Sequence, residues 1–150
     1  MLCLNAIELD FIQALLKRNV RFLVVGGHAV IYYGYERVTK DLDLLIDASS
    51  ENIHQLRLTL ALMNIAVDDQ VLNRMSAPKA IVSIDRLGIE LLSSVDGVDF
   101  NEAYEKSLLA IKEGMKIPMI SFAHLLESKK AANRARDIED VKALIEINRA

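Results

Sequence analysis

Residues 22–47 read FLVVGGHAVIYYGYERVTKDLDLLID, and this stretch decides the fold. An apolar strand ends in Gly26-Gly27, and after thirteen intervening residues a second strand opens with Asp41 and Asp43 in a D-x-D pattern. Side chains alternate faces along a strand, so Asp41 and Asp43 point the same way. Like charges held this close raise each other's pKa unless a cation neutralises them. The pair therefore predicts a divalent metal site, and carboxylate oxygens suit Mg²⁺.

The glycine pair predicts a phosphate cradle beside that metal. Gly26 and Gly27 let the chain turn sharply with no side chain in the way, and His28 to Tyr35 then reads as a short helix. The free backbone N–H groups and the positive dipole end of this helix would face an anion. A glycine pair alone is often only a turn, but the order of strand, glycine pair, helix and D-x-D strand is far more specific.

These residues resemble the signature of a known family. The GG at 26–27 followed by RVTKDLDLL at 37–45 is similar to the pattern of the nucleotidyltransferase superfamily, whose members share the DNA polymerase beta palm fold. The chain resembles the small prokaryotic branch, with its minimal nucleotidyltransferases and the nucleotidyltransferase proteins of toxin–antitoxin and abortive-infection systems. GIELL at 88–92 resembles the strand of the third carboxylate, and residues 125–140 resemble a closing helix pair. The likeness spans roughly residues 20–145.

The resemblance implies an enzyme, an NTP-dependent nucleotidyltransferase with two Mg²⁺ ions as cofactors. Asp41 and Asp43 would hold both ions, and Glu90 would complete the site of the ion that activates the acceptor. Gly26 and Gly27 would anchor the triphosphate through their backbone. A nucleoside monophosphate would move from the NTP to a hydroxyl of a protein, an RNA end or a small molecule, and pyrophosphate would leave.

Three further residues are nucleotide-binding candidates. Arg37 and Thr39 precede the carboxylate strand and could contact phosphate or acceptor, although Arg37 could equally be a surface arginine. Lys129 matches a lysine of similar proteins and could lie near the nucleotide phosphates. Many relatives carry Asp where this chain has Glu90, and Asp85 is a rival for the third carboxylate, although Asp at a turn often serves its own backbone.

The end of the chain allows two interpretations. Asp137 and Asp140 have the spacing of an N-cap and an N3 acid, so they could simply start the last helix and pair with Arg134 or Arg136. They could also belong to the functional site. The basic residues here could form a small local patch or a solvated helix face: Lys129, Lys130, Arg134 and Arg136.

The remaining reactive side chains give weaker signals. His28 would lie in the first turn of the phosphate-facing helix, where it could contact a ligand or be buried. No Cys or His stands at metal-ligand spacing, so zinc has no support at His54 or His124. Cys3 lacks a partner motif and suggests a structural residue. Tyrosines at 32, 33 and 35 could stack a base but more often pack against a core edge.

Composition bounds the class of protein. A chain of 150 residues suits one domain, residues 1–150, with no linker or repeat inside it. A net charge of −3 argues against an extended nucleic-acid-binding surface. The single cysteine excludes an intrachain disulfide, and Glu8 and Asp10 interrupt any signal-peptide pattern. No apolar run approaches the roughly 18 residues of a membrane span. We therefore expect a cytoplasmic protein.

The expected architecture is α/β (α+β), a mixed sheet of about four or five strands with helices covering one face and the carboxylates at a rim. The patterns predict strands over 22–25, 42–46, 79–84, 89–92, 108–111 and 116–120, and helices over 6–18, 28–35, 49–63, 101–107, 121–133 and 137–148. Residues 66–77 remain ambiguous. A tight turn over 85–88 would bring Glu90 beside the first two strands.

Three functions are compatible with these residues. The first is an active nucleotidyltransferase, and the second is a degenerate domain that binds a nucleotide or partner, for example as an antitoxin. The third, adenylylation of aminoglycosides, usually needs an additional substrate-binding domain for which this chain has little room. Because minimal domains often draw specificity from elsewhere, we expect a partner protein or a second copy of the chain.

Overall fold

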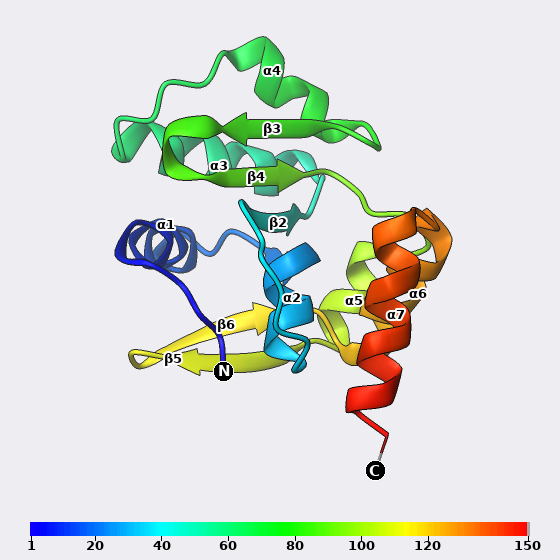
Figure 1. Cartoon of the computed structure of the whole chain (residues 1–150). Coiled ribbons are helices and arrows are strands. Elements are labelled where there is room, and N and C mark those ends of the chain that lie inside the picture. The colour runs from blue at the N-terminus through cyan, green and yellow to red at the C-terminus, as the bar shows by residue number, and fades with distance from the viewer. Residues whose placement is uncertain (150) are drawn as a thin grey trace.

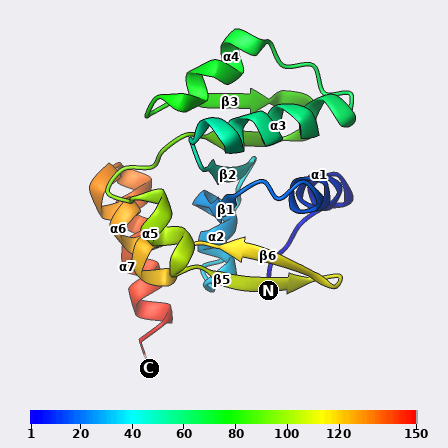
Figure 2. The same cartoon turned by 180° about the vertical axis from the view of Figure 1, so that it is seen from behind.

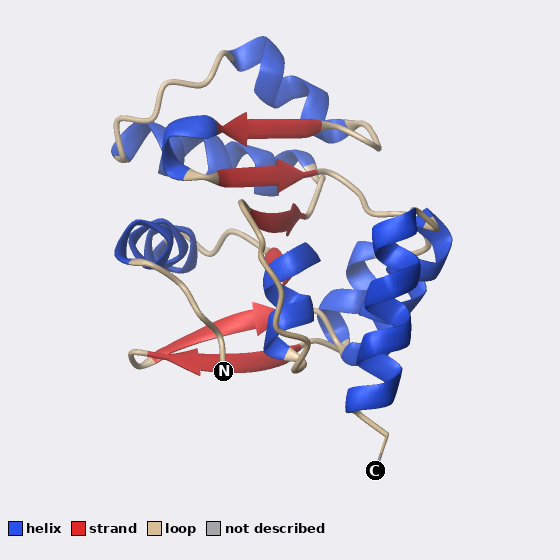
Figure 3. Cartoon of the chain, viewed as in Figure 1, coloured by secondary structure: helices blue, strands red, loops and turns tan. Residues whose placement is uncertain are grey.

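The computed structural model describes residues 1–149 as one six-stranded sheet with helices packed around it (Figures 1 and 3). The strands are β1 (Phe22–Val25), β2 (Leu42–Ile46), β3 (Ile81–Ile84), β4 (Ile89–Leu92), β5 (Leu108–Lys112) and β6 (Met115–Met119). The α-helices are α1 (Ala6–Lys17), α2 (Gly26–Tyr32), α3 (Ser50–Leu62), α4 (Asp69–Asn73), α5 (Phe100–Glu105), α6 (Phe122–Ala132) and α7 (Ala135–Ile147). Two short 3-10 helices, η1 (Arg74–Ser76) and η2 (Asp85–Leu87), complete the elements.

The sheet is mixed, with strand order β3-β4-β2-β1-β6-β5. β1 and β2 are antiparallel, and β2 pairs with β4 in parallel. The hairpins β3–β4 and β5–β6 form the two edges. The expectation of four or five strands was therefore too low. The second hairpin joins through a short parallel contact, in which Val24 pairs with Met119, and a sequence pattern gives no sign of so short a pairing.

Helices cover both faces of the sheet, so the prediction that they cover only one face is wrong. In Figure 1, α2 lies in front of β1 while α3 lies behind β4, and Figure 2 shows the reverse. The physical reason is that the central strands are almost entirely buried. All four residues of β1 are buried, and so are four of the five residues of β2. Strands of this kind need apolar cover on both sides.

The helix boundaries follow recognisable caps. Asn5 and Glu8 form a capping box at the start of α1, and this helix buries Phe11, Ile12 and Leu15 as its amphipathic pattern predicts. Ser49 caps α3 by accepting a hydrogen bond from the N–H of Asn52, so the cap is the first residue of the helix predicted over 49–63.

The structure defines three segments more closely than the sequence does. The second helix begins at Gly26 and not at His28, because the glycine pair forms its first turn. The ambiguous segment 66–77 contains α4 and η1. The expected turn over 85–88 is η2 followed by Gly88 in the left-handed conformation, with φ 66°. No helix within residues 1–149 combines the length and apolar character required to cross a bilayer.

Candidate active site

Two carboxylates meet at the centre of the sheet. In the parallel pairing of β2 with β4, Asp43 stands directly opposite Glu90, so both side chains lie on the same face. Burial, the charges of Glu90 and Asp41, and a hydrogen bond with Glu90 together raise the pKa of Asp43 to about 6, although the Lys129 charge acts in the opposite direction. An aspartate with a pKa this high sits in an environment that favours a proton or a cation.

Asp41 lies at the edge of this pair. It lines the same pocket as Asp43 and Glu90, and its charge contributes to the raised pKa of Asp43. Its Oδ1 faces Gly88, lying 3.9 Å from the position that a Cβ on Gly88 would occupy. Across residues 1–149, no three acidic, histidine or cysteine side chains are gathered closely enough to enclose a metal ion on their own. The structure thus brings Asp43 and Glu90 together and leaves Asp41 on the pocket wall.

The rival third carboxylate lies elsewhere. Asp85 is exposed at the start of η2, whereas Glu90 is part-buried on β4. The tight connection between β3 and β4 places Glu90 in register with Asp43, as the hairpin prediction requires.

Gly26 and Gly27 allow the start of α2 to lie directly against the carboxylate strand and the loop before it. Gly26 adopts φ 66°, and a Cβ there would overlap the carboxylate of Asp43. A Cβ on Gly27 would overlap the hydroxyl group of Thr39. The N-cap residue Val25 supplies no side-chain hydrogen bond to the first turn. The two glycines therefore bring the backbone of α2 close to Asp43 and Thr39.

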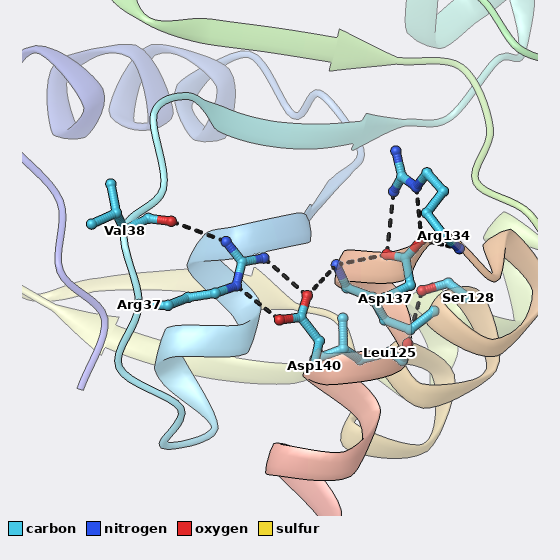
Figure 4. A network of polar contacts seen from close by, with 8 residues as sticks. Arg37, Val38, Leu125, Ser128, Arg134, Asp137 and Asp140 are labelled. Carbon is cyan, nitrogen blue, oxygen red and sulfur yellow. Dashed lines mark hydrogen bonds and ion pairs between the residues drawn. The ribbon is translucent and has the colours of Figure 1, made fainter.

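A buried ion network lies beside the pair and joins three segments that are far apart in sequence (Figure 4). The Lys129 Nζ lies 2.9 Å from Asp140 Oδ2 and 3.3 Å from Asp137 Oδ1. Arg37 donates to both oxygens of Asp140, from Nε at 2.9 Å and from Nη2 at 3.0 Å, and donates to the Val38 carbonyl from Nη1 at 3.1 Å. Asp137 and Asp140 are both fully buried. The donors of Arg37 are thus engaged within the protein.

The acids of α7 do more than start the helix. Arg134 is the N-cap residue and Asp137 is the third residue of α7, so the N-cap position expected for Asp137 is wrong. The Arg134 N–H and guanidinium both donate to Asp137. Burial acts to raise the pKa of Asp137, but the hydrogen bonds from Arg134 and the charge of Lys129 outweigh burial and lower it. The pairing with Arg134 is as predicted, and the contact with Lys129 adds a link to α6.

Two pockets flank Asp43 and Glu90, and both carboxylates line each of them. The larger pocket has a volume of about 390 Å³ and is also lined by Gly26, Lys79, Ile81, Leu92, Ser94, Val95, Asp96, Ser128, Lys129, Arg134 and Asp137, among others. The smaller pocket, of about 350 Å³, is also lined by Val38, Thr39, Lys40, Asp41 and Arg136. The predicted residues Gly26 and Lys129 therefore belong to one pocket, and Thr39 to the other.

Sequence reasoning missed several lining residues. Ser94 and Asp96 follow the carboxyl end of β4, and polar residues just past a strand that carries Glu90 were an available signal. Lys79 precedes β3 with no local pattern to mark it. Lys40 is adjacent to Asp41, but only the fold shows that it shares a pocket with Arg136.

Three of the other candidate side chains have structural partners. His28 is buried, its Nε2 lies 3.7 Å from Glu8 Oε2, and burial lowers its pKa against the opposing effect of Glu8. The Tyr33 hydroxyl donates to the Ile120 carbonyl, and its ring packs edge-on against Tyr32 and Phe122. His124 contacts the cap residue Ser121. These contacts favour the packing interpretation for the tyrosines.

The mixed sheet, with carboxylates on neighbouring strands beside a glycine turn, defines a nucleotidyltransferase-like fold. A family model described as "Nucleotidyl transferase of unknown function (DUF2204)" matches residues 7–150, and the chain belongs to this family. Among solved structures, a candidate nucleotidyltransferase from Thermotoga maritima is similar with a TM-score of 0.60, covering 91% of this chain and 89% of its own at 18% sequence identity. That likeness shows a shared fold. No curated protein matches the chain in sequence.

Proposed function

We propose that this protein is a Mg²⁺-dependent nucleotidyltransferase that moves a nucleoside monophosphate from an NTP to a hydroxyl acceptor. The observation that carries the proposal is the pair of Asp43 and Glu90, held in register on adjacent strands and shared by two pockets. A transferase needs a place for its donor and a place for its acceptor on either side of one reacting centre.

The residues present fit a magnesium ion. Burial, together with the charges of Glu90 and Asp41, raises the pKa of Asp43, so this environment disfavours its negative charge unless a cation is bound. Asp43 and Glu90 would hold one Mg²⁺, and Asp41 would join them for the second ion of a two-metal site. Bound there, the metal would lower the pKa of the acceptor hydroxyl and stabilise charge on the transferring phosphate.

The chain's own groups would bind the NTP in the larger pocket. Gly26 brings the backbone at the start of α2 to this pocket, and Lys129 and Arg134, which are paired with Asp137, also line it. The apolar side chains of Ile81, Leu92 and Val95 offer a surface for the sugar or base. Thr39 lines the smaller pocket, where its hydroxyl could orient the acceptor. The role of Arg37 is then to hold the loop before β2 through Asp140, with no direct contact to phosphate.

A catalytically weak binding domain is the second candidate. One observation favours it: Asp41 is not gathered with Asp43 and Glu90 into a three-carboxylate group within residues 1–149. A domain of this kind would bind a nucleotide or a partner without turnover, and an antitoxin role in a toxin–antitoxin pair would suit it. In either case we propose that a partner protein or a second copy of the chain supplies specificity, in the cytoplasm.

The test is a transfer assay. The protein is incubated with each α-labelled NTP and Mg²⁺, with total tRNA, cell protein or aminoglycosides as acceptors, and the label in each fraction is measured. We expect label in one acceptor fraction for the wild type and a loss of at least about a hundredfold for Asp43→Ala, because removing a metal-holding carboxylate removes charge stabilisation at the reacting centre. Equal labelling by both proteins would contradict the enzyme, whereas nucleotide binding without transfer would favour the second candidate.

A further inference from the structure

The smaller pocket is lined by two cationic side chains that have no acidic partner among the described residues. Its two cationic side chains, Lys40 and Arg136, are both exposed, and neither takes part in an ion pair within residues 1–149. The basic residues of the buried network are different, because Arg37, Lys129 and Arg134 are each paired with an acid of α7. Among the cations that line the larger pocket, Lys79 alone has no ion pair within residues 1–149. The positive charge of the smaller pocket is therefore available to a ligand.

The positions of these two cations are set by the buried network. Lys40 lies three residues after Arg37, whose guanidinium is bound to Asp140. Arg136 lies four residues before Asp140 on α7, so both share one helix face. The ion pair of Arg37 with Asp140 thus ties the loop that carries Lys40 to the helix that carries Arg136 (Figure 4).

A cation at Asp43 and Glu90 would change the balance of the smaller pocket. With those two carboxylates neutralised, Asp41 is the remaining acid on its walls, against Lys40 and Arg136. The pocket then has an excess of positive charge next to the reacting centre. An arginine guanidinium binds phosphate through paired N–H donors, and a lysine ammonium adds a point charge. A cationic acceptor would meet repulsion here.

We propose that the smaller pocket is the acceptor site and that it binds a nucleotide unit with a free ribose hydroxyl. Arg136 and Lys40 would bind the phosphate of that unit. This inference rests on the proposed function and narrows its acceptor. The volume of about 350 Å³ lies at the low end of small-molecule sites, which suits one nucleotide unit. That unit is either a free nucleotide or the end of an RNA strand, since both present the same chemistry.

The test compares adenosine with AMP, which differ only by the phosphate, and adds a short single-stranded RNA as the second source. Binding is measured by calorimetry in the presence of Mg²⁺ and a saturating non-hydrolysable ATP analogue, which fills the larger pocket. We expect AMP or the RNA end to bind about tenfold or more tightly than adenosine, since one charge-assisted hydrogen bond contributes about this factor. Tighter binding of the RNA than of AMP would identify the acceptor as the end of an RNA strand. Tighter binding of AMP would identify it as a free nucleotide.

Variants locate the effect. Arg136→Ala and Lys40→Ala should each weaken AMP or RNA binding about five- to tenfold and leave binding of the ATP analogue within about twofold. Lys142→Ala, which removes an exposed cation from the same helix outside both pockets, should change neither. Arg136→Glu should reverse the preference so that adenosine binds more tightly than AMP, a result that misfolding cannot produce.

The outcomes separate the two proposals. If the ATP analogue binds but AMP and RNA gain nothing from their phosphates, or lose nothing in Arg136→Ala, the acceptor assignment is overturned and the transferase proposal stands. If no transfer occurs with any acceptor, yet AMP binding still depends on Arg136, the anion site is supported and the proposed activity fails. An acidic peptide that displaces AMP with the same dependence on Arg136 would overturn the nucleotide assignment.

Discussion

At the scale of single residues, the central feature is the raised pKa of Asp43. Its folded-state pKa of about 6 lies above the roughly 3.9 of an aspartate in an unfolded chain. Between about pH 4 and about pH 6 the folded state therefore binds more protons than the unfolded state, and the stability contributed by this group falls as the pH rises through that window. Above the window the full cost is present.

The first prediction removes that cost. In the presence of a metal chelator, Asp43→Asn should raise the free energy of unfolding at pH 7.5 by about 1–2 kcal/mol, after allowing for the partial exposure of the carboxylate. Near pH 3, below both pKa values, Asp43 is largely protonated in both states and the gain should nearly vanish. Urea denaturation at the two pH values measures both effects. If the variant is less stable than the wild type at pH 7.5, the ionised carboxylate of Asp43 does not destabilise the folded state.

The second prediction concerns the contact between Gly27 and Thr39. Gly27→Ala should destabilise the protein by about 1–3 kcal/mol, because its methyl group would overlap the Thr39 side chain. Thr39→Gly removes the side chain that the new methyl group would meet, so it should make room for alanine at position 27. In the double variant the loss of unfolding free energy should be smaller than the sum of the two single losses, because the two residues share a contact. Strict additivity in urea denaturation would mean that Gly27 is needed for some other reason.

At the scale of elements, the loop before β2 is held by α7. Arg37 reaches Asp140, Asn148 donates to the Tyr33 carbonyl, and Ile147 lies against Gly34. These contacts join the segment that leads to Asp41 to a helix more than a hundred residues later in the chain. The position of the carboxylate strand therefore depends on a helix that carries no carboxylate of the proposed metal site.

The third prediction tests this dependence. Asp140→Ala should cost about 3–5 kcal/mol in unfolding free energy, because it leaves the buried cation of Lys129 and the guanidinium of Arg37 without their shared partner. It should also speed hydrogen exchange of the backbone N–H groups over residues 35–40. Glu139→Gln, an exposed acid on the same helix, should stay within about 0.5 kcal/mol of the wild type. Similar losses of unfolding free energy in the two variants would contradict the proposal that Asp140 holds the loop before β2.

Element-level features were predictable where they depend on local pattern. The D-x-D alternation and the short link between β3 and β4 were sufficient to place Glu90 beside Asp43, and the helices predicted over 6–18 and 49–63 are present as α1 and α3. The start of α2 at Gly26 was missed, because glycine is a poor helix former and here serves close packing against Asp43.

At the scale of the whole molecule, the features that escaped prediction are long-range ones. One example is the ion pair of Arg37 with Asp140, and another is the shared pocket of Lys40 and Arg136. Both join residues that are far apart in the chain, so no local spacing predicts them. The same holds for the pairing of β6 with β1, which makes six strands of the expected four or five. The resemblance to nucleotidyltransferases identified the fold, and the chain's membership of the family agrees with it.

The central claim is that Asp43 and Glu90 together hold a divalent cation. Titration of the metal-free protein with Mn²⁺, followed by electron paramagnetic resonance, tests this most directly, and Asp43→Asn, Glu90→Gln and Asp85→Asn serve as comparisons. We expect a binding site in the wild type and in Asp85→Asn, weakened at least about tenfold by either of the other two changes, because each removes a charged ligand. Equal affinity in all four proteins would contradict the account.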